Sequence, residues 1–263
     1  MLTQQTLTTL RRMKLHGMAA AFEWQLTTRG THDDMSFEER LGLMVDHEQT
    51  YRETKRLERL LKNARLKQPS ACIEDIDYSH RRGLEKRQMA SLVTCDWIRQ
   101  HRNLCITGPT GTGKTWLSCA LGNQACRLGI SVLYARTSRL FEELKIAHGD
   151  GSFPRRMAGL AKVELLILDD WGLSPLARSE KHDLLEIMED RHSNRSVIIT
   201  SQLPVEKWHE YISEPTIADA VLDRVVHNSH KIALRGESLR KTKNYMGNLQ
   251  MHSSRSCETN ARK

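Results

Sequence analysis

The feature of this sequence that most constrains its fold is the octet "GPTGTGKT", residues 108–115 of a 263-residue chain. It fits the pattern G-x-x-x-x-G-K-[ST], in which backbone N–H groups of a glycine-rich turn and of the following helix point at phosphate oxygens. "NLCIT", just before it, is typical of a short buried strand, and residues 116–128 carry apolar side chains at helical spacing. Because the motif requires this order of strand, loop and helix, the sequence predicts a nucleoside triphosphate site rather than an ordinary Gly/Thr turn.

The residues of this loop have different expected tasks. Lys114 would reach the β- and γ-phosphates, and the hydroxyl of Thr115 would bind Mg²⁺. The residues expected to contact the nucleotide are Gly108, Pro109, Thr110, Gly111, Thr112, Gly113, Lys114, Thr115 and Trp116. The loop predicts that the protein binds a nucleoside triphosphate. The process that would use the energy of its hydrolysis has to be inferred from the rest of the chain.

Two carboxylates follow a second apolar run. In "VELLILDDWG", four apolar residues end at Asp169 and Asp170. At the end of a buried strand, Asp169 would be placed to coordinate Mg²⁺. Asp170, the next residue, would point in a different direction and could act as general base or orient the attacking water. The alternative is a helix cap or turn formed by "DDWGLSP". The phosphate loop upstream favours the catalytic interpretation.

Polar residues end a third apolar run, "RSVIITSQLP". If this strand lies between the strand of the phosphate loop and the strand of Asp169, a polar side chain at its tip would reach the γ-phosphate. Gln202 is the first candidate, Ser201 is the second, and Thr200 shares the tip. Simple capping of the strand end explains any one of these residues nearly as well.

Two arginines lack a carboxylate four residues away in either direction, Arg224 in "DAVLDRVV" and Arg240 in "GESLRKTK". Glu237, three residues before Arg240, could still pair with it on a helix. An unpaired arginine can stabilise the charge of phosphoryl transfer in its own subunit or in a neighbouring one. Local sequence alone favours the ordinary alternative for each, which is a solvated surface arginine.

The periodicity of the chain predicts a helical part followed by an α/β part. Residues 1–67 have helical spacing, with a capping box formed by Ser36 and Glu39. Residues 68–80 have the composition of a linker. Residues 81–243 alternate strands with helices, which predicts a parallel α/β sheet covered on both faces. The expected strands are 104–107, 132–135, 163–168, 196–201 and 231–234, and a loose tail is expected at 244–263.

Positive charge is concentrated toward the two ends of the chain. The formal net charge is +8, and residues 231–263 hold 8 Lys and Arg against 2 Asp and Glu, whereas residues 101–230 hold 15 against 16. Basic flanks suggest a polyanionic partner, with nucleic acid first, although a solvated surface is the alternative. A basic helical face is the first candidate DNA surface: Arg52, Lys55, Arg56, Arg59 and Lys62. The second is a loop-rich strip around the flexible segment "HGDGSFPRR": Arg136, Arg139, Lys145, Arg155 and Arg156.

The aromatic content bears on the kind of nucleic acid. The chain has 5 Trp, 5 Tyr and 4 Phe, and its basic helical face contains none of them beyond the flanking Tyr51. Single-strand binders usually offer aromatic side chains for base stacking, whereas phosphate contacts alone suit a duplex. We therefore expect binding to duplex DNA.

Composition also argues against a membrane protein and a disulfide scaffold. No apolar run approaches the roughly 18 residues of a membrane span, so we expect a soluble, cytoplasmic protein with no membrane contact. The six cysteines include no C-x-x-C pair, which favours reduced apolar fillers over disulfides or zinc ligands.

These motifs, in this order, resemble those of the AAA+ ATPase superfamily. Within it, "LLILDDWGLSPL", "TSQLP", "LDRVVHNSHKIALRGESLRK" and "TLRRMKLHGMAAAFEWQ" resemble the IstB-like helper ATPases of bacterial insertion sequences, a sister group of the DnaC helicase loaders. The resemblance extends over residues 9–243. It implies an AAA+ core with strand order 5-1-4-3-2, a small helical N-terminal domain and a reduced or absent C-terminal lid.

The same resemblance implies functional roles. It implies ATP and Mg²⁺ as cofactors, a homo-oligomer on duplex DNA, and the transposase of the same element as partner in DNA transposition. It makes residues 108–115 Walker A, Asp169 and Asp170 Walker B, and the 200–202 tip sensor 1. Arg224 becomes the finger that reaches a neighbour's ATP, and Arg240 becomes sensor 2.

One departure and two alternatives accompany this assignment. Walker B is Asp-Asp where the wider superfamily has Asp-Glu, so ATP hydrolysis is expected to be slow and to be stimulated by DNA, oligomerisation or the partner. A DnaC-like helicase loader acting on single-stranded DNA in replication is the main alternative. A stand-alone nucleotide kinase is disfavoured because such enzymes need an arginine-rich second substrate pocket and a lid.

Overall fold

The computed structural model describes residues 2–28, 30, 34–78 and 82–239. Arg240, the region of the expected lid after it and the expected tail at 244–263 lie outside the described residues. The chain divides into two compact units, residues 1–62 and 63–263, and each is described by itself. The functional borders expected after residues 67 and 80 stay predictions.

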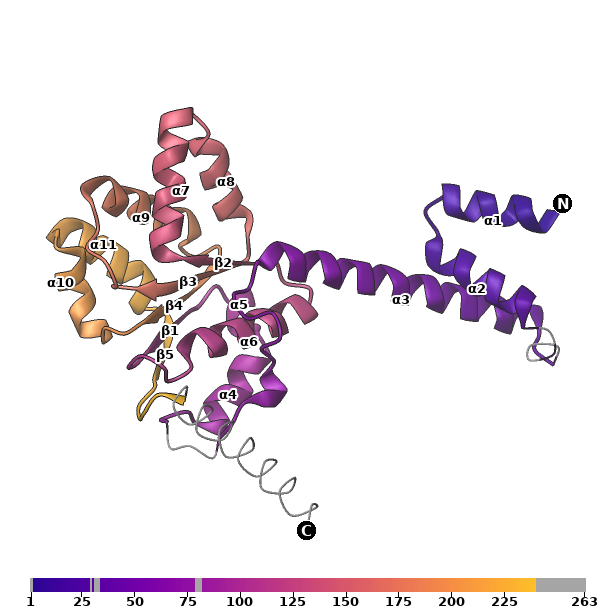
Figure 1. Ribbon diagram of the computed structural model, residues 1–263, viewed down its shortest axis with the longest axis horizontal. Coiled ribbons are helices and arrows are strands. Elements are labelled where there is room, and N and C mark those ends of the chain that lie inside the picture. The colour runs from indigo at the N-terminus through magenta and orange to yellow at the C-terminus, as the bar shows by residue number, and fades with distance from the viewer. Residues whose placement is uncertain (1, 29, 31–33, 79–81, 240–263) are drawn as a thin grey trace, which may run out of the picture. The chain divides into compact units, whose positions relative to one another are not determined.

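The first unit is built from helices, as the periodicity predicts. They are α1 (Leu2–Arg12), α2 (His16–Thr27) and α3 (Phe37–Ala64) (Figure 1). The predicted capping box is confirmed, because the Ser36 N–H donates to Glu39 Oε2 at 2.7 Å and the Glu39 N–H donates to Ser36 Oγ at 3.2 Å. Two backbone groups that α3 could not pair by itself are thereby satisfied.

A buried carboxylate joins α3 to the start of α2. Glu48 Oε2 accepts the N–H groups of Gly17 and Met18 at 2.7 and 3.1 Å, where the helix dipole favours negative charge. Arg52 Nε donates to Glu48 Oε1 at 2.7 Å. Burial acts to raise the pKa of Glu48, but the hydrogen bonds from Arg52 and the two N–H groups outweigh it, and the pKa is lowered. A side chain on Gly17 would collide with the backbone of His47 and Glu48, so this approach requires glycine.

The second unit contains a five-stranded parallel sheet in the order β2-β3-β4-β1-β5, which confirms the implied order 5-1-4-3-2. The strands are β1 (Asn103–Thr107), β2 (Val132–Arg136), β3 (Leu165–Trp171), β4 (Ser196–Ser201) and β5 (Ser229–Ala233). Because β4 lies between β1 and β3, the carboxyl ends of the three strands that carry the predicted motifs meet at one edge. Ligands of open α/β sheets bind at this edge.

Helices cover both faces of the sheet (Figure 1). One face carries α6 (Lys114–Arg127), on which α4 (Lys86–Val93) packs, and α5 (Asp96–Arg99) leads into β1. The opposite face carries α7 (Thr137–Asp150), α8 (Phe153–Lys162), α9 (Arg178–Arg191), α10 (Trp208–Ile212) and α11 (Pro215–Val226). The rings of Trp171 and Trp208 lie 5.5 Å apart in the apolar core on that side. In the described part of the chain, no helix is both long and apolar enough to span a membrane.

Buried thiols agree with the prediction that the cysteines are apolar fillers. Cys95, Cys105, Cys119 and Cys126 are buried and free. Burial raises the pKa of each of these thiols, to about 11 for Cys105 and about 12 for Cys126. They therefore remain protonated and weakly reactive at neutral pH.

Two expectations about local structure are wrong. Residues 148–156, expected as a flexible loop, form the last turn of α7, a short link and the first turn of α8. Gly151, at φ 75°, ends α7, and Pro154 fits the first turn of α8, where its missing N–H costs no hydrogen bond. The segment "GLEKRQMASLVTCDWIRQ", residues 83–100, is typical of one helix, but the structure divides it into α4 and α5, because Cys95 adopts φ 58° between them.

A buried arginine joins three elements at the amino edge of the sheet. Arg191, the last residue of α9, is 2% exposed. Its guanidinium donates to the carbonyl oxygens of Leu160, Val163, Glu164 and Ser196 at 2.7, 3.0, 3.2 and 2.7 Å. Burial lowers the pKa of Arg191 to about 9, which leaves it protonated at neutral pH. One cation therefore satisfies carbonyls from α8, from the residues before β3 and from β4.

We expect Arg191→Met to lower the free energy of unfolding by at least about 3 kcal/mol, because it leaves buried carbonyls without donors. Urea unfolding of the full chain measures this change. Arg178→Met, at the exposed start of the same helix, is the matched control and should change stability by no more than about 0.5 kcal/mol. Equal unfolding midpoints for the two variants would contradict the assignment.

Candidate functional site

The phosphate loop connects β1 to α6, as the motif requires. Gly108 and Gly111 adopt φ values of 147° and 85°. A side chain on Gly108 would collide with Leu234, and one on Gly111 would collide with Ser238, both from the segment that follows β5. The backbone conformation and this close approach each require glycine at these two positions.

Lys114 is folded back onto the loop. Its Nζ donates to the carbonyl oxygens of Gly108 and Pro109 at 2.6 and 2.8 Å, and the residue is 8% exposed. The ammonium therefore lies within the turn that would surround the phosphates. Phosphate oxygens could replace the two carbonyls as its acceptors. Trp116 is half-buried in the first turn of α6.

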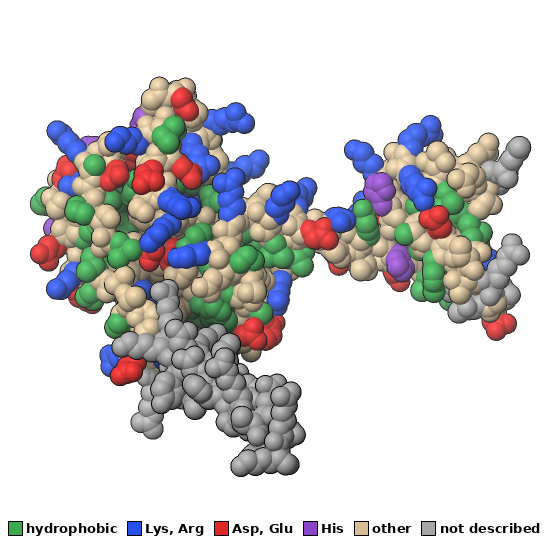
Figure 2. Space-filling model, in the orientation of Figure 1, with side chains coloured by type: hydrophobic (Ala, Val, Ile, Leu, Met, Phe, Trp, Pro, Cys, Tyr) green, Lys and Arg blue, Asp and Glu red, His purple; other side chains and the backbone are tan. Residues whose placement is uncertain are grey.

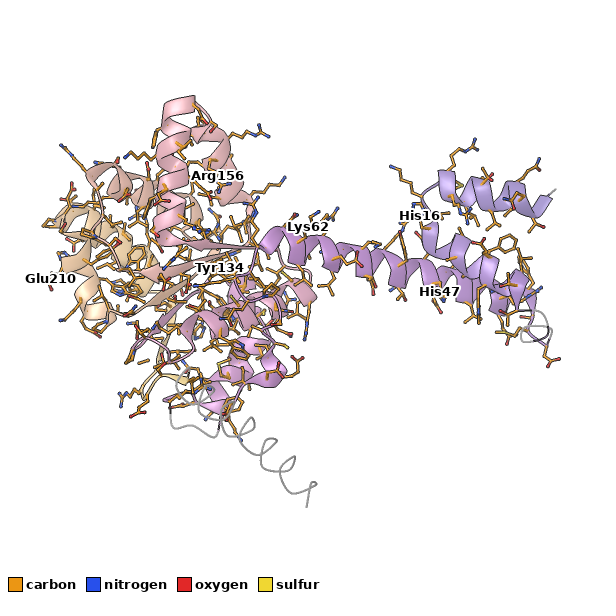
Figure 3. The ribbon with its side chains drawn as sticks, in the orientation of Figure 1. His16, His47, Lys62, Tyr134, Arg156 and Glu210 are labelled. Atoms are coloured by element: carbon orange, nitrogen blue, oxygen red, sulfur yellow. The ribbon has the colours of Figure 1, made fainter. Side chains whose placement is uncertain are left out.

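Asp169 is the centre of a polar network beside the loop. It is fully buried, and its carboxylate accepts hydrogen bonds from Thr115 Oγ1 at 2.9 Å, Thr200 Oγ1 at 2.5 Å and Tyr134 Oη at 2.6 Å. Lys67 Nζ lies 3.6 Å from Oδ2 of the same carboxylate. Burial and the hydrogen bond to Asp169 raise the pKa of Tyr134, which is labelled on the sheet in Figure 3, so its phenol remains a donor.

The Thr115–Asp169 pair has the donor types of a magnesium site. Mg²⁺ takes oxygen ligands and is usually held by one or two carboxylates together with substrate phosphates and waters. The Thr115 hydroxyl can donate its proton to Asp169 and still offer a lone pair to a cation. Among the residues that the structure describes, no group of three or more His, Cys, Asp or Glu could hold a metal, so the phosphates would complete the shell. The residues present therefore fit ATP with Mg²⁺.

Asp170, the expected general base, is held by an arginine. It adopts φ 61° at an irregularity between Leu168 and Trp171, where β3 departs from regular pairing with β4. Arg136 Nε donates to Asp170 Oδ2 at 2.9 Å, and 20% of the Asp170 side chain is exposed. Arg136 was expected among the DNA contacts, and the structure places it against the expected base.

The three polar residues at the tip of β4 have different contacts. Thr200 Oγ1 donates to Asp169 and accepts the N–H of Asp170 at 3.2 Å. Gln202 Oε1 accepts the hydroxyl of Thr110, in the phosphate loop, at 2.7 Å. Ser201 is buried, and its Oγ donates to Trp171 O at 2.8 Å. Thr200 and Gln202 therefore contact the groups expected to hold the nucleotide, whereas the contacts of Ser201 are those of a turn.

Arg224 lies on α11 and is paired with a carboxylate from α9. Its guanidinium donates to Ala220 O at 2.7 Å and to Glu189 Oε1 at 3.1 Å, and its side chain is 27% exposed. Within the described residues it makes no hydrogen bond to the phosphate loop of its own chain. This placement is compatible with action on a neighbouring subunit. Arg240 lies outside the described residues.

The first set of expected DNA-binding residues shares one face of α3. Its members repeat at intervals of three and four residues: Arg52, Lys55, Arg56, Arg59 and Lys62. They are exposed. Arg52 is paired with Glu48, and Lys55 is paired with Glu58.

Four residues of the second set lie on helices rather than on a loop-rich strip, and the fifth, Arg136, ends β2. Arg139 and Lys145 are exposed on α7, and Arg155 is exposed on α8. Arg156, labelled on α8 in Figure 3, is ion-paired with Glu143. Lys and Arg side chains gather over α8 in Figure 2.

Sequence patterns missed several groups at this site. Tyr134, in β2, donates to the carboxylate of Asp169, and Thr137, the first residue of α7, donates to the backbone oxygen of Asp169. The placement of β2 beside β3 could have pointed to them. Lys67 ends the segment with helical spacing and lies 3.6 Å from Asp169, and Arg82, which precedes α4, donates from Nη1 to Thr112 O at 3.4 Å. No sequence signal marks either of them.

Comparison with known proteins identifies similar chains. Residues 8–246 match the family described as IstB-like ATP binding protein. An insertion sequence ATP-binding protein of Pseudomonas fluorescens is 57% identical over 204 residues, which are 78% of this chain and 88% of that protein. An insertion sequence ATP-binding protein of Sinorhizobium fredii is 52% identical over 241 residues, which are 92% of this chain and 98% of that protein.

Solved structures of lower identity share the fold. The structure of DnaI superposes with a TM-score of 0.54 at 21% identity, covering 67% of this chain and 93% of that chain. The DnaC helicase loader superposes with a TM-score of 0.51 at 16% identity, covering 62% and 96%. The likeness at these identities concerns the fold alone and, with the strand order, confirms the predicted AAA+ core.

We expect Thr200→Val to lower the free energy of unfolding by about 2–3 kcal/mol, because it removes a buried donor from the Asp169 carboxylate. Thr200→Ser keeps the hydroxyl and should lose about 1 kcal/mol, which is the effect of one buried methyl group. Urea unfolding of the two variants separates these effects. A loss in Thr200→Val no larger than that in Thr200→Ser would contradict the strength assigned to this hydrogen bond.

Proposed function

Because the chain belongs to the family of IstB-like ATP binding proteins, we propose that it is an ATP-dependent helper of a bacterial insertion sequence. It assembles on duplex target DNA and cooperates with the transposase of the same element in DNA transposition. ATP binding favours assembly, and hydrolysis releases the subunits. The names of the relatives support the insertion-sequence context and the nucleotide.

The observation that carries this proposal is the hydrogen-bonded path from the phosphate loop to the acidic pair. It runs from Thr115 through Asp169 and Thr200 to the N–H of Asp170. Bound Mg²⁺ would supply positive charge to the β- and γ-phosphates. Lys114 exchanges its two carbonyl acceptors for the same phosphates, and Asp170 accepts a proton from the attacking water.

Arg136 limits the availability of Asp170. The guanidinium of Arg136 occupies Oδ2 of Asp170 at 2.9 Å, so the attacking water has to compete with it for the carboxylate. Slow basal hydrolysis follows from this pairing as well as from the short Asp side chain. Arg136 ends β2, close in sequence to the basic residues of α7, so a DNA phosphate that attracted Arg136 would free Asp170 and stimulate hydrolysis.

Oligomerisation completes the proposed active site. Arg224 acts on the ATP of a neighbouring subunit after it leaves Glu189, and it stabilises the charge of phosphoryl transfer. The ion pair with Glu189 is partly exposed, so the cost of breaking it is small. A homo-oligomer also repeats the basic surfaces along the DNA.

A basic hollow supports the proposed DNA contact in the second unit. It has a volume of about 470 Å³, and its lining includes Arg65, Arg155 and Arg156. The hollow is large enough for a backbone phosphate. A guanidinium group can donate two parallel hydrogen bonds to the oxygens of one phosphate. The basic face of α3 supplies a second contact. Phosphate contacts carry no base information, so binding tolerates any sequence.

We expect Lys114→Ala to weaken ATP binding by about tenfold to a hundredfold, because the phosphates lose a charged donor. Asp170→Asn should keep ATP affinity and lower the hydrolysis rate by about a hundredfold or more, because an amide cannot accept the proton. Calorimetric titration and phosphate release measure the two effects. Asp190→Asn, an exposed carboxylate on α9, is the control. Hydrolysis at the parent rate by Asp170→Asn would refute the base assignment.

We expect duplex binding whose log affinity falls with log salt at about −0.9 per phosphate contact. Replacing Arg155 and Arg156 with Ala should flatten this slope by roughly one to two units per bound subunit and weaken all sequences alike. Arg178→Ala controls for the loss of a surface arginine. Binding is measured on random duplexes and matched single strands with ATP. Preference for single strands, or a slope near zero, would favour the helicase-loader alternative.

A further inference from the structure

The segment that follows α3 is anchored to α6. Ala64 and Leu66 are buried, and Asn123 Nδ2 donates to Pro69 O at 3.1 Å. A side chain added to Gly122 would begin 3.0 Å from Leu66 Cδ2, so glycine leaves the space on α6 that Leu66 uses. These contacts hold the backbone on both sides of Lys67.

The anchored segment brings Lys67 to the buried carboxylate of Asp169. Lys67 Nζ lies 3.6 Å from Oδ2, the oxygen that also accepts the hydroxyl of Tyr134. The side chain of Lys67 is 45% exposed, whereas that of Asp169 is fully buried. In the part of the chain that the structure describes, Lys67 supplies the ion pair of Asp169. The exposed amine can leave the carboxylate without disturbing the core.

A divalent cation at Thr115 and Asp169 would bring two more positive charges close to this ammonium. Like charges a few ångströms apart repel, and screening is weak beside a buried carboxylate. We infer that Lys67 competes with nucleotide-bound Mg²⁺ for Asp169, so that loading the metal–nucleotide complex releases Lys67. The inference rests on the proposed ATP site and adds a regulatory group to it. Because Lys67 follows the end of α3 by three residues, its release signals the nucleotide state to the segment where the two units meet in sequence.

The test measures ATP affinity by calorimetry at a series of Mg²⁺ concentrations and in EDTA, on the full chain. Lys67→Met removes the charge and keeps most of the stem, and Lys67→Arg keeps the charge. Lys162→Met, at the exposed end of α8, is the matched control. Thermal unfolding verifies that each variant is folded.

We expect Lys67→Met to lower the Mg²⁺ concentration for half-maximal binding by about two- to fivefold, the effect of losing a half-exposed ion pair. Lys67→Arg and Lys162→Met should match the parent protein, and ATP affinity in EDTA should not change. An unchanged Mg²⁺ dependence in Lys67→Met overturns the inference alone. Weaker ATP binding of Lys67→Met in EDTA also overturns it, because Lys67 would then be a phosphate ligand. A parent protein that binds no ATP at any Mg²⁺ concentration overturns the proposed function as well.

Discussion

The carboxylate of Asp169 and the groups that satisfy it determine the arrangement of the nucleotide site. Its partners come from α6, β2, β4 and the segment after α3, and its backbone oxygen accepts the hydroxyl of Thr137 at the start of α7. A buried carboxylate without such partners would be strongly unfavourable, so the charge holds these elements together. The same charge is suited to a cation. Stability of the fold and the proposed binding of Mg²⁺ would therefore use the same atoms.

Strong local signals made much of this site predictable. A phosphate loop needs a strand before it and a helix after it, and an apolar strand ending in Asp169 and Asp170 could be recognised in the same way. The contact of Lys67 could not be read from sequence, because it joins segments far apart in the chain. Those of Tyr134 and Arg136 could be anticipated only from the placement of β2 beside β3. The turn at Gly151 was missed because a glycine between polar residues is equally typical of a loop and of a helix end.

The charge composition predicted a basic protein, but it overestimated the number of Lys and Arg side chains that are available to bind a polyanion. Arg52 is ion-paired with Glu48, which accepts the first N–H groups of α2. Arg136 is ion-paired with Asp170, and Arg156 with Glu143. Each of these residues has a task within its own unit before any polyanion is bound. A net charge counts such arginines in full, although a polyanion would have to displace the carboxylates that already pair with them. Arg155 and Lys145 carry no such competing ion pair among the described residues.

Arg191 and Asn103 both make their hydrogen bonds at the amino edge of the sheet. Asn103 Oδ1 accepts the N–H of Val197, and its Nδ2 donates to the carbonyls of Arg224 and Val225, so β1, β4 and α11 are joined close to where Arg191 holds β3 and β4. These two side chains join the elements at the amino edge of the sheet by hydrogen bonds. Asp169, Asp170 and the tip of β4 lie at the opposite edge. Arg224 therefore belongs to a helix that is hydrogen-bonded to the amino edge of the sheet, on the side opposite to Asp169 and Asp170.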